Sequence, residues 1–290
     1  MMRRFHGAAL AAVVAVGFAS SSFAADMPAK GPVYKAPVAA PVYSWTGVYI
    51  GVNGGYAGRG NRDVTFTPND PLAALGCLGV GGGACTRPSS ANLRGGFGGI
   101  QVGYNLQFGR NWLLGVETDF NGSGIRGSGT AAPFQFIGGS TANFTTEQDI
   151  KWFGTVRARL GYLPTESLLF YATGGFAYAR VDESAVLNST GGAANSGGFG
   201  ANCTLGAGTL PVCFTGASSR TAAGWTAGGG LEFAVWRNLS LKAEYLYVGL
   251  PGRSVTVTAI NGAGAIPASF SANFGRSDFQ LARLGLNYRF

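Results

Sequence analysis

The stretch FGGIQVGYNLQF, residues 97–108, decides the fold of this chain. Large apolar side chains alternate in it with small or polar ones: Ile100, Val102, Tyr104, Leu106 and Phe108 against Gln101, Gly103, Asn105 and Gln107. A β-strand places successive side chains on opposite faces, whereas a helix would scatter both sets around its axis. The stretch therefore predicts a strand with one apolar face and one polar face.

The same alternation recurs along the chain in eight segments: residues 45–57, 97–108, 112–121, 150–162, 168–181, 223–236, 239–248 and 277–290. In the fifth segment the two faces are nearly equal in polarity, so its orientation stays open. The connections alternate between long ones (58–96, 122–149, 182–222 and 249–276) and short ones (109–111, 163–167 and 237–238). This pattern predicts an all-β fold: an eight-stranded antiparallel up-and-down transmembrane β-barrel with four long external loops and three short periplasmic turns.

The character of the two faces indicates which one meets the lipid. Trp, Tyr, Phe, Leu and Val lie on one face, while Gly, Asn, Gln and charged residues lie on the other. Apolar side chains outside and small or polar ones inside are typical of a membrane barrel, whose closure leaves no backbone group unpaired in the hydrocarbon.

A soluble barrel of the lipocalin type is the main alternative. It would have to pack all the aromatic side chains into a narrow interior. Its surface would be rich in glycine and poor in charge, because the 290 residues include 49 Gly and only 12% charged residues. A periplasmic β-sandwich agrees less well with the up-and-down series of connections.

The N-terminus has the pattern of an export signal. Arg3 and Arg4 precede an apolar run over residues 8–18, and Ser22-Phe23-Ala24 resembles a cleavage site. The run is too short to span about 30 Å of hydrocarbon, so a cleaved signal is favoured over a membrane anchor. We expect a signal peptide at 1–24, a flexible Pro/Ala-rich periplasmic leader at 25–44 and the outer-membrane barrel at 45–290.

The composition argues against several kinds of chemistry. The net charge of +8 includes no dense run of Lys or Arg, which argues against nucleic acid as a partner. The single histidine, His6, lies in the predicted signal, so the mature chain would have no histidine for acid–base catalysis. We therefore predict no catalytic residue, no cofactor and no metal site.

The four cysteines form two local pairs in glycine-rich stretches: Cys77 with Cys85, and Cys203 with Cys213. In an oxidising compartment, such pairs are predicted to form disulfides that hold loops together. Zinc is the less favoured alternative, because the spacing is not CxxC and no histidine accompanies the cysteines.

Charged residues occupy the inward face of several predicted strands. Glu117 and Asp119 lie on one segment, and Arg157 and Arg159 lie on the next, which should be its direct neighbour. Because buried charge is costly unless it is paired, we predict an interior cluster of Glu117, Asp119, Arg157, Arg159, Glu232, Lys242, Glu244 and Arg283. The favoured interpretation is a packed plug that stiffens the barrel, and the alternative is the lining of a narrow ion path.

Two stretches carry a resemblance to a known family: WTGVYIG at 45–51 and LGLNYRF at 284–290. Together with the alternation and the predicted signal, they make residues 45–290 similar to the small outer-membrane barrels of the OmpA/OmpX and opacity-protein superfamily, especially the porin-like surface antigens. The resemblance implies that Leu286, Tyr288 and Phe290 belong to a C-terminal assembly signal, which the barrel-assembly machinery engages.

Outer-membrane lipids and lipopolysaccharide are the expected partners of such a barrel. Aromatic side chains are placed to form girdles at the membrane interfaces: Trp45, Trp112, Trp152, Tyr162, Trp236, Tyr245 and Tyr288. Arginines near the loop bases are placed to pair with lipopolysaccharide phosphates, with ordinary loop solvation as the alternative: Arg59, Arg62, Arg94, Arg126, Arg220, Arg253 and Arg276.

The favoured function is a structural one: support of envelope integrity and presentation of loops for adhesion, for a host or surface ligand, or for immune recognition. A small porin that passes ions or small solutes is the alternative, and conductance separates the two. An outer-membrane enzyme would need a site built from Asp, Glu, Ser or Tyr, and no such site stands out by its spacing.

Overall fold

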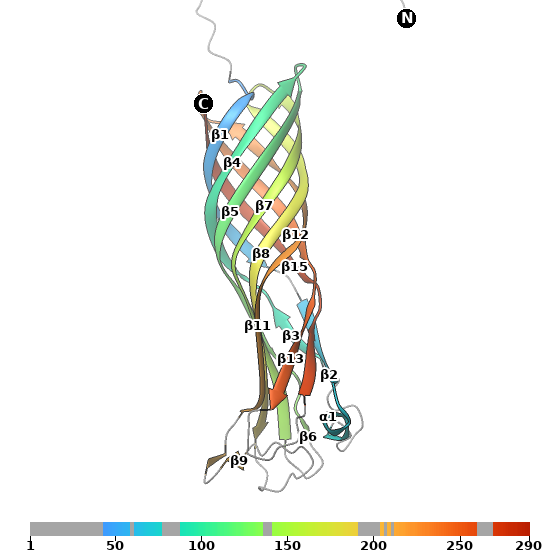
Figure 1. Ribbon diagram of the computed structural model, residues 1–290. Helices are drawn as coiled ribbons and strands as arrows, with labels where there is room; N and C mark the ends of the chain where they lie inside the picture. The colour runs from blue at the N-terminus through green and yellow to red at the C-terminus, as the bar shows by residue number, and fades with distance from the viewer. Residues whose placement is uncertain are drawn as a thin grey trace, which may run out of the picture. The chain divides into compact units, whose positions relative to one another are not determined.

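The computed structural model describes residues 43–58, 61–76, 88–135, 141–190, 204–205, 208–209, 212–259 and 269–290. Eight of the described strands form a closed ring of antiparallel neighbours (Figure 1). In ring order they are β12 (Leu239–Leu250), β15 (Ser277–Arg289), β1 (Gly47–Gly58), β4 (Gly95–Phe108), β5 (Trp112–Thr130), β7 (Thr141–Thr165), β8 (Leu168–Thr190) and β11 (Val212–Ala234). Pairing of β11 with β12 closes the ring. The predicted eight-stranded antiparallel barrel is confirmed.

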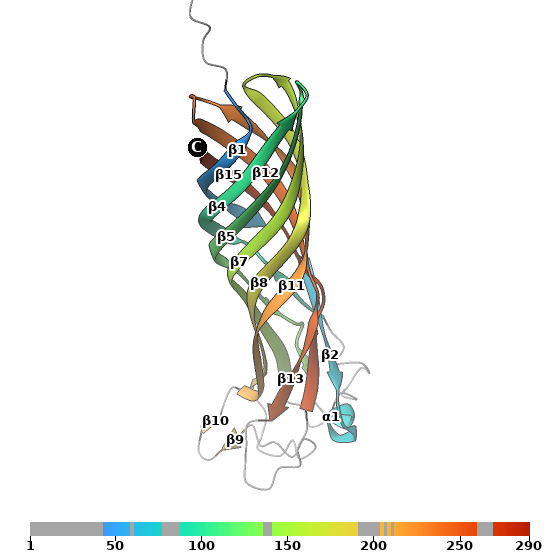
Figure 2. The same ribbon diagram turned by 45° about the horizontal axis from the view of Figure 1, so that its top comes forward.

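Three short connections lie at one mouth of the ring, at residues 109–111, 166–167 and 235–238. Figure 2 turns this mouth toward the viewer and shows the C-terminus beside the start of β1. The two chain segments are joined there by a hydrogen bond of 3.1 Å from Phe290 N to Val48 O. Gly109 has a φ of +62°, a left-handed conformation that glycine adopts without strain, and it allows the tight turn from β4 to β5.

At the opposite end, β5, β7, β8 and β11 continue well beyond the ring. β7 has 25 residues, whereas about 9–11 residues of a tilted strand suffice to cross the hydrocarbon. Four further strands continue the sheet from β11: β13 (Arg253–Ala259) pairs with its extension, and β14 (Ser269–Phe274), β2 (Asn61–Pro68) and β3 (Ser89–Asn92) follow in that order. We call the result the stalk: these four strands together with residues 124–130, 141–150, 181–190 and 212–222 (Figure 1).

The regions predicted as long loops therefore contain much more β-structure than expected. Their strands alternate apolar residues with Ser, Thr and Asn, as in SFSANF of β14, so they lack the sharp contrast of the membrane segments. Shorter elements are α1 (Pro71–Gly76), β6 (Phe134–Gln135), β9 (Thr204–Leu205) and β10 (Gly208–Thr209). Within the described part of the chain, no helix has the length and apolar character needed to cross a membrane.

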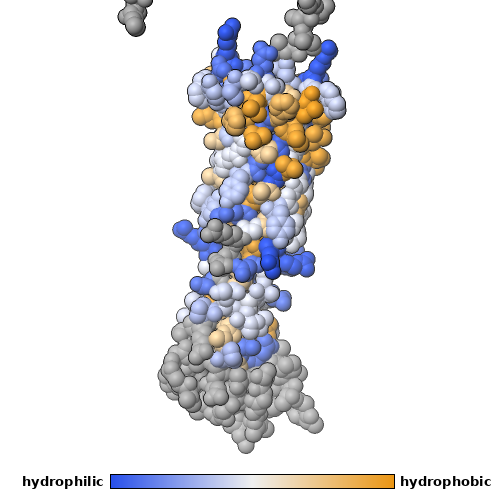
Figure 3. Space-filling view, turned by 180° about the vertical axis from the view of Figure 1, so that it is seen from behind, coloured by the Kyte–Doolittle hydropathy of each residue, from blue (hydrophilic) through white to orange (hydrophobic). Residues whose placement is uncertain are grey.

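The large apolar side chains of the ring point outward, as predicted. Ile100 is 65% exposed and Val116 58%, whereas Gln101 and Glu117, their neighbours in sequence, are buried. Figure 3 shows hydrophobic side chains gathered around the end of the molecule that carries the short turns, with hydrophilic side chains on either side. The fifth predicted segment, residues 168–181, now has a defined outward face, because Phe170 is exposed on the outside of the ring.

Three apolar clusters fill the interior at different heights. The mouth cluster lies beside the short turns and comprises Trp45, Leu113, Leu163, Leu169 and Tyr171. The middle cluster includes Phe97, Ile125, Ile150, Phe153 and Phe279. The stalk cluster includes Phe66, Phe144, Phe214, Val257 and Phe270. Polar side chains occupy the interior between the mouth cluster and the middle cluster.

Candidate functional site: a charge cluster inside the barrel

The eight charged residues predicted to face inward lie together in the lumen of the ring. Three cross-strand pairs place a carboxylate directly opposite a cation: Glu117 opposite Arg157, Glu232 opposite Lys242, and Glu244 opposite Arg283. Strand geometry therefore brings most of the cluster together, since directly opposed residues share one face. We call the eight residues the charge cluster: Glu117, Asp119, Arg157, Arg159, Glu232, Lys242, Glu244 and Arg283.

Arg157 lies at the centre of the charge cluster. Its Nη1 is 2.8 Å from Glu244 Oε1, and its Nη2 is 2.9 Å from Asp119 Oδ2. The same Nη2 also contacts Glu117 Oε1, and Nε donates a 2.8 Å hydrogen bond to Thr155 Oγ1. One guanidinium thus joins three carboxylates from two other strands, β5 and β12.

The remaining cations complete the network. Arg159 Nη2 is 2.7 Å from Glu232 Oε2, and Lys242 Nζ is 2.9 Å from Glu117 Oε1. Arg283 Nη2 is 2.5 Å from Glu244 Oε2 and 3.1 Å from Asp119 Oδ2. Every carboxylate of the charge cluster therefore contacts at least one cation.

The eight residues of the charge cluster are fully buried, and their formal charges balance. The cluster contains four carboxylates and four cations, and all eight side chains have 0% exposed surface. Removing these ions from water costs several kcal/mol each, which ion pairs and hydrogen bonds must offset. Pairing of opposite charges is what such a site requires in order to remain folded.

Two tyrosines belong to the site, although the sequence analysis did not include them in the cluster. Tyr49 donates a 2.7 Å hydrogen bond to Glu117 Oε2 and accepts one of 2.7 Å from Arg159 Nη1. Tyr171 donates one of 3.0 Å to Glu244 Oε1, and the Arg159 guanidinium lies 4.0 Å from the centre of its ring. The position of Tyr49 on the polar face of its segment was the available signal.

A glycine provides the space for one of these rings. A Cβ atom at position 103 would overlap the ring and hydroxyl of Tyr49, which lies across the backbone of β4. The small residue on the inward face of β4 thus allows the large one on β1.

The residues before β1 fold into the mouth of the barrel. Trp45, predicted to belong to an interfacial girdle, is only 1% exposed, and its Nε1 donates a 2.8 Å hydrogen bond to Glu166 O. Arg289 Nη1 donates one of 3.0 Å to Ser44 O, and its guanidinium lies 5.1 Å from the Trp45 ring. The prediction for Trp45 is therefore wrong, because this side chain packs against the buried Leu113 and Leu163 inside the lumen.

The sequence of β7 shows how the charge cluster is enclosed. Its inward side chains pass from Leu163 in the mouth cluster to Arg159 and Arg157, and then to Phe153 in the middle cluster. Apolar layers thus lie on both sides of the ions along the barrel axis. The ions are therefore enclosed between two apolar layers.

Known proteins with related sequences and structures place this architecture in a family. The family of the outer membrane protein beta-barrel domain matches residues 10–290. The chain belongs to this family. The 31 kDa outer-membrane immunogenic protein of Brucella melitensis biotype 1 is 38% identical over 284 residues, 96% of this chain and 98% of that protein. The protein of the same name from Brucella suis biovar 1 matches to the same extent.

Among solved structures, this family member is similar to OprG from Pseudomonas aeruginosa, with 13% identity, a TM-score of 0.40 and coverage of 86% of this chain and 99% of that one. Ail, the attachment invasion locus protein of Yersinia pestis, is 13% identical with a TM-score of 0.31 and coverage of 84% and 99%. Neither likeness indicates what this chain binds. Family membership confirms the expected location in the outer membrane.

The other predicted site residues of this outer-membrane barrel lie in three places. Leu286, Tyr288 and Phe290 face outward on β15 and beyond it, with exposures of 41%, 49% and 71%. Cys77, Cys85 and Cys203 lie outside the described residues, and of Cys213 only the backbone is described. Of the other predicted girdle residues, Trp152 is half-buried, and five are exposed: Trp112, Tyr162, Trp236, Tyr245 and Tyr288.

Proposed function

We propose that this outer-membrane barrel is a closed structural protein that contributes to envelope integrity and carries the stalk and its loops at the cell surface for adhesion or immune recognition. The burial of the charge cluster between two apolar layers is the observation that supports this proposal most strongly. An interior filled by paired ions and apolar side chains stiffens a cylinder and leaves no continuous aqueous route. The predicted signal peptide and periplasmic leader complete the proposal.

The stalk supports the surface role. Beyond Asp149, eight residues of β7 lead to Thr141, which at about 3.3 Å per residue corresponds to about 26 Å. The stalk has its own apolar core, with the Phe66 and Phe144 rings stacked 3.7 Å apart. A stiff support of this length would hold the distal loops away from the membrane surface.

A small porin is the second candidate, and conductance tests it. In planar lipid bilayers the purified protein is expected to give no steady conductance steps, because the charge cluster lies between two apolar layers. An open porin inserted into the same bilayers serves as the control for insertion and detection. Steady conductance of the native protein that Arg157→Ala abolishes would overturn the closed-barrel proposal.

An enzymatic role is not proposed. The interior carboxylates are the buried groups suited to acid–base chemistry, but each is ion-paired and has no exposed surface. A substrate would have to enter through the mouth cluster or the middle cluster to reach them. General acid–base catalysis needs a group within hydrogen-bond reach of the substrate.

The exposed C-terminal side chains support the proposed recognition by the barrel-assembly machinery. Removing Phe290, whose ring lies 5.3 Å from that of Tyr288, is expected to reduce strongly the amount of folded protein in the outer membrane. Folded barrel is measured by its heat-dependent migration in detergent gels of membrane fractions. Phe290→Tyr, which keeps an aromatic terminus, should assemble normally, and normal assembly of the shortened chain would contradict the assignment.

A further inference from the structure

The first and last strands of the ring meet at one seam. Along the chain the ring strands follow one another as β1, β4, β5, β7, β8, β11, β12 and β15, and seven of their eight pairings join consecutive members of this series. The pairing of β1 with β15, residues 49–58 with 280–289, joins its two ends. Contacts between distant parts of a chain form late, because bringing those parts together costs entropy before any contact offsets it. We therefore expect the ring to open first at this seam.

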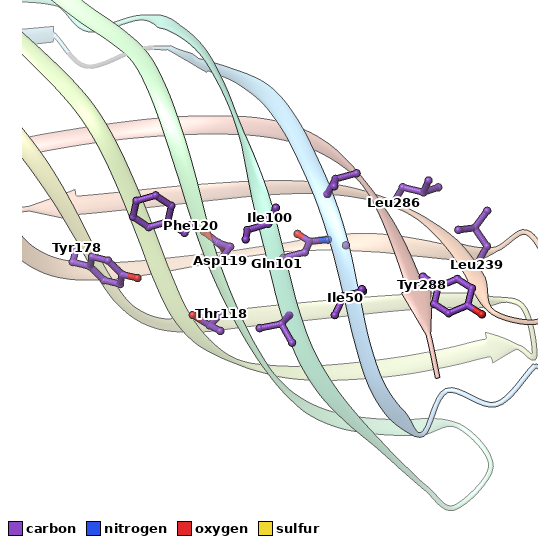
Figure 4. Close-up of a pocket in the computed structure, with 13 residues that line it drawn as sticks. Ile50, Ile100, Gln101, Thr118, Asp119, Phe120, Tyr178, Leu239, Leu286 and Tyr288 are labelled. Carbon is purple, nitrogen blue, oxygen red and sulfur yellow. The ribbon is translucent and has the colours of Figure 1, made fainter.

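Side chains on the outer face contribute little to holding the seam together. Ile50 of β1 lies opposite Tyr288 of β15 (Figure 4), and Val52 lies opposite Leu286. In the membrane these side chains contact acyl chains whether the two strands are paired or apart, and acyl chains are as apolar as they are. Besides the backbone hydrogen bonds, the contacts that hold the seam must therefore lie on its inner face.

The inner face of the seam carries a buried cation at the mouth with the short turns. Arg289, directly opposite Tyr49, is only 3% exposed. Its Cζ lies 5.1 Å from the ring centres of both Tyr43 and Trp45 and 5.7 Å from that of Tyr49. We call these three rings the aromatic cage. A ring face attracts a cation within about 6 Å, and the attraction is larger when both are withdrawn from water.

Arg289 has no closely paired carboxylate. Among the described residues, the one carboxylate within 4.0 Å belongs to Glu232, whose Oε1 lies 3.9 Å from Nη2, too far for a hydrogen bond. That oxygen already accepts hydrogen bonds of 2.5 Å from Ser240 Oγ and 3.0 Å from Asn287 Nδ2. Arg289 Nη1 donates one of 3.0 Å to Ser44 O, whereas Nε and Nη2 have no hydrogen-bond partner among the described residues. The aromatic cage and the Ser44 carbonyl therefore supply the close contacts of this buried charge.

The aromatic cage is also fixed to the opposite side of the mouth. Trp45 Nε1 bonds to Glu166 O in the turn between β7 and β8, and β8 lies four places from β1 in the ring order. The Trp45 ring packs in the mouth cluster, and the Tyr43 ring meets it edge-on with the ring centres 4.8 Å apart. Residues 43–46 thus cross the mouth, and they contact Arg289 at a position that β15 provides only when it is paired with β1.

We propose that Arg289 and the aromatic cage form a latch, which holds the closed ring against opening at the seam between β1 and β15. The aromatic cage comes from the first part of the barrel and the cation from the last strand, so the latch engages only after the two ends of the chain have met. Loss of either half leaves the backbone hydrogen bonds of the seam in place but removes the inner-face contact that opposes their separation. The effect is local, because the charge cluster and the other strand pairings keep all their contacts.

Hydrogen exchange of the purified protein in lipid nanodiscs, followed by mass spectrometry, tests the latch. In Arg289→Met, the amides of residues 49–53 and 285–289 should exchange about tenfold or more faster, because a desolvated cation–π contact is lost from the closed state. Trp45→Leu keeps an apolar side chain, removes the ring and leaves the last strand unchanged, and it should accelerate exchange of the same amides. The amides of residues 116–121 in β5 should exchange at the native rate in both variants.

Two further variants sharpen the test. Arg110→Met removes an exposed arginine from the turn between β4 and β5 at the same mouth and should leave exchange at the seam unchanged. The double variant Trp45→Leu with Arg289→Met should exchange no faster at the seam than the faster of the two single variants, since both changes remove one shared contact.

Three results would refute the latch: native exchange rates at the seam in both single variants, equal acceleration at the seam and in β5, or fold-changes that multiply in the double variant. Refolding from urea into detergent micelles before transfer to nanodiscs keeps the comparison independent of the barrel-assembly machinery. Heat-dependent gel migration shows that each variant is folded.

Discussion

Replacing Arg157 by alanine is expected to lower the free energy of unfolding by about 3–5 kcal/mol, because the change leaves buried carboxylates without their shared partner. Glu117, Asp119 and Glu244 all contact this guanidinium, and none of them has exposed surface. Urea unfolding in detergent micelles, followed by tryptophan fluorescence, measures the change.

The control for this prediction is Arg237→Ala in the exposed turn before β12, which is expected to change stability by about 0.5 kcal/mol or less. Arg157→Lys keeps the positive charge but loses the planar set of N–H donors of the guanidinium. Its loss of unfolding free energy should therefore lie between those of Arg157→Ala and Arg237→Ala. A loss of less than about 1 kcal/mol for Arg157→Ala would show that the charge cluster is solvated, since exposed ion pairs contribute only about that much.

Replacing Phe144 by alanine is expected to cost about 3–5 kcal/mol of local stability in the stalk, since truncation of a buried ring leaves a cavity. Phe144 is 1% exposed, stacks on Phe66 and lies 5.6 Å from the Phe270 ring. The middle cluster and the charge cluster do not depend on this side chain. The stalk should therefore open while the ring stays closed.

Limited proteolysis in detergent micelles separates these two parts of the molecule. The Phe144→Ala protein should be cut in the stalk and should leave a protected fragment that still shows heat-dependent gel migration. Thr256→Ala serves as the matched control, because it changes an exposed side chain on β13 between the buried Val255 and Val257. The stalk of this variant should resist the protease. Loss of the whole barrel on Phe144→Ala would contradict the independence of the stalk core.

The sequence was most informative where the two faces of a strand differ most. Apolar and polar side chains alternate so regularly over residues 97–108 that both the strand and its lipid-facing side could be predicted. The same alternation predicted the inward-facing charged residues of β5 and β7. The opposition of Glu117 and Arg157 required only that the two strands be neighbours. The cluster was predictable because burial leaves charged side chains few alternatives to pairing.

Other features depended on contacts that no local pattern contains. The stalk strands escaped prediction because Ser, Thr and Asn face water there, whereas large apolar side chains face lipid in the ring. Trp45 was assigned to a girdle from its residue type, but its indole finds a backbone acceptor at Glu166, far away in sequence. Arg94 lies between β3 and β4, and its isolated bridge to Arg126 follows no alternation that the sequence displays.

The central claim is that the outward apolar side chains of the ring contact lipid acyl chains while the lumen stays closed to water. Fluorescence quenching by brominated lipids tests this claim most directly. Trp112 is 47% exposed and Trp45 is 1% exposed, yet both lie at the mouth with the short turns. In single-tryptophan variants reconstituted into vesicles, lipids brominated near the head group should quench Trp112 strongly and Trp45 weakly, and aqueous iodide should quench neither efficiently. Strong lipid quenching of Trp45 with little quenching of Trp112, or efficient iodide quenching of Trp45, would contradict the account.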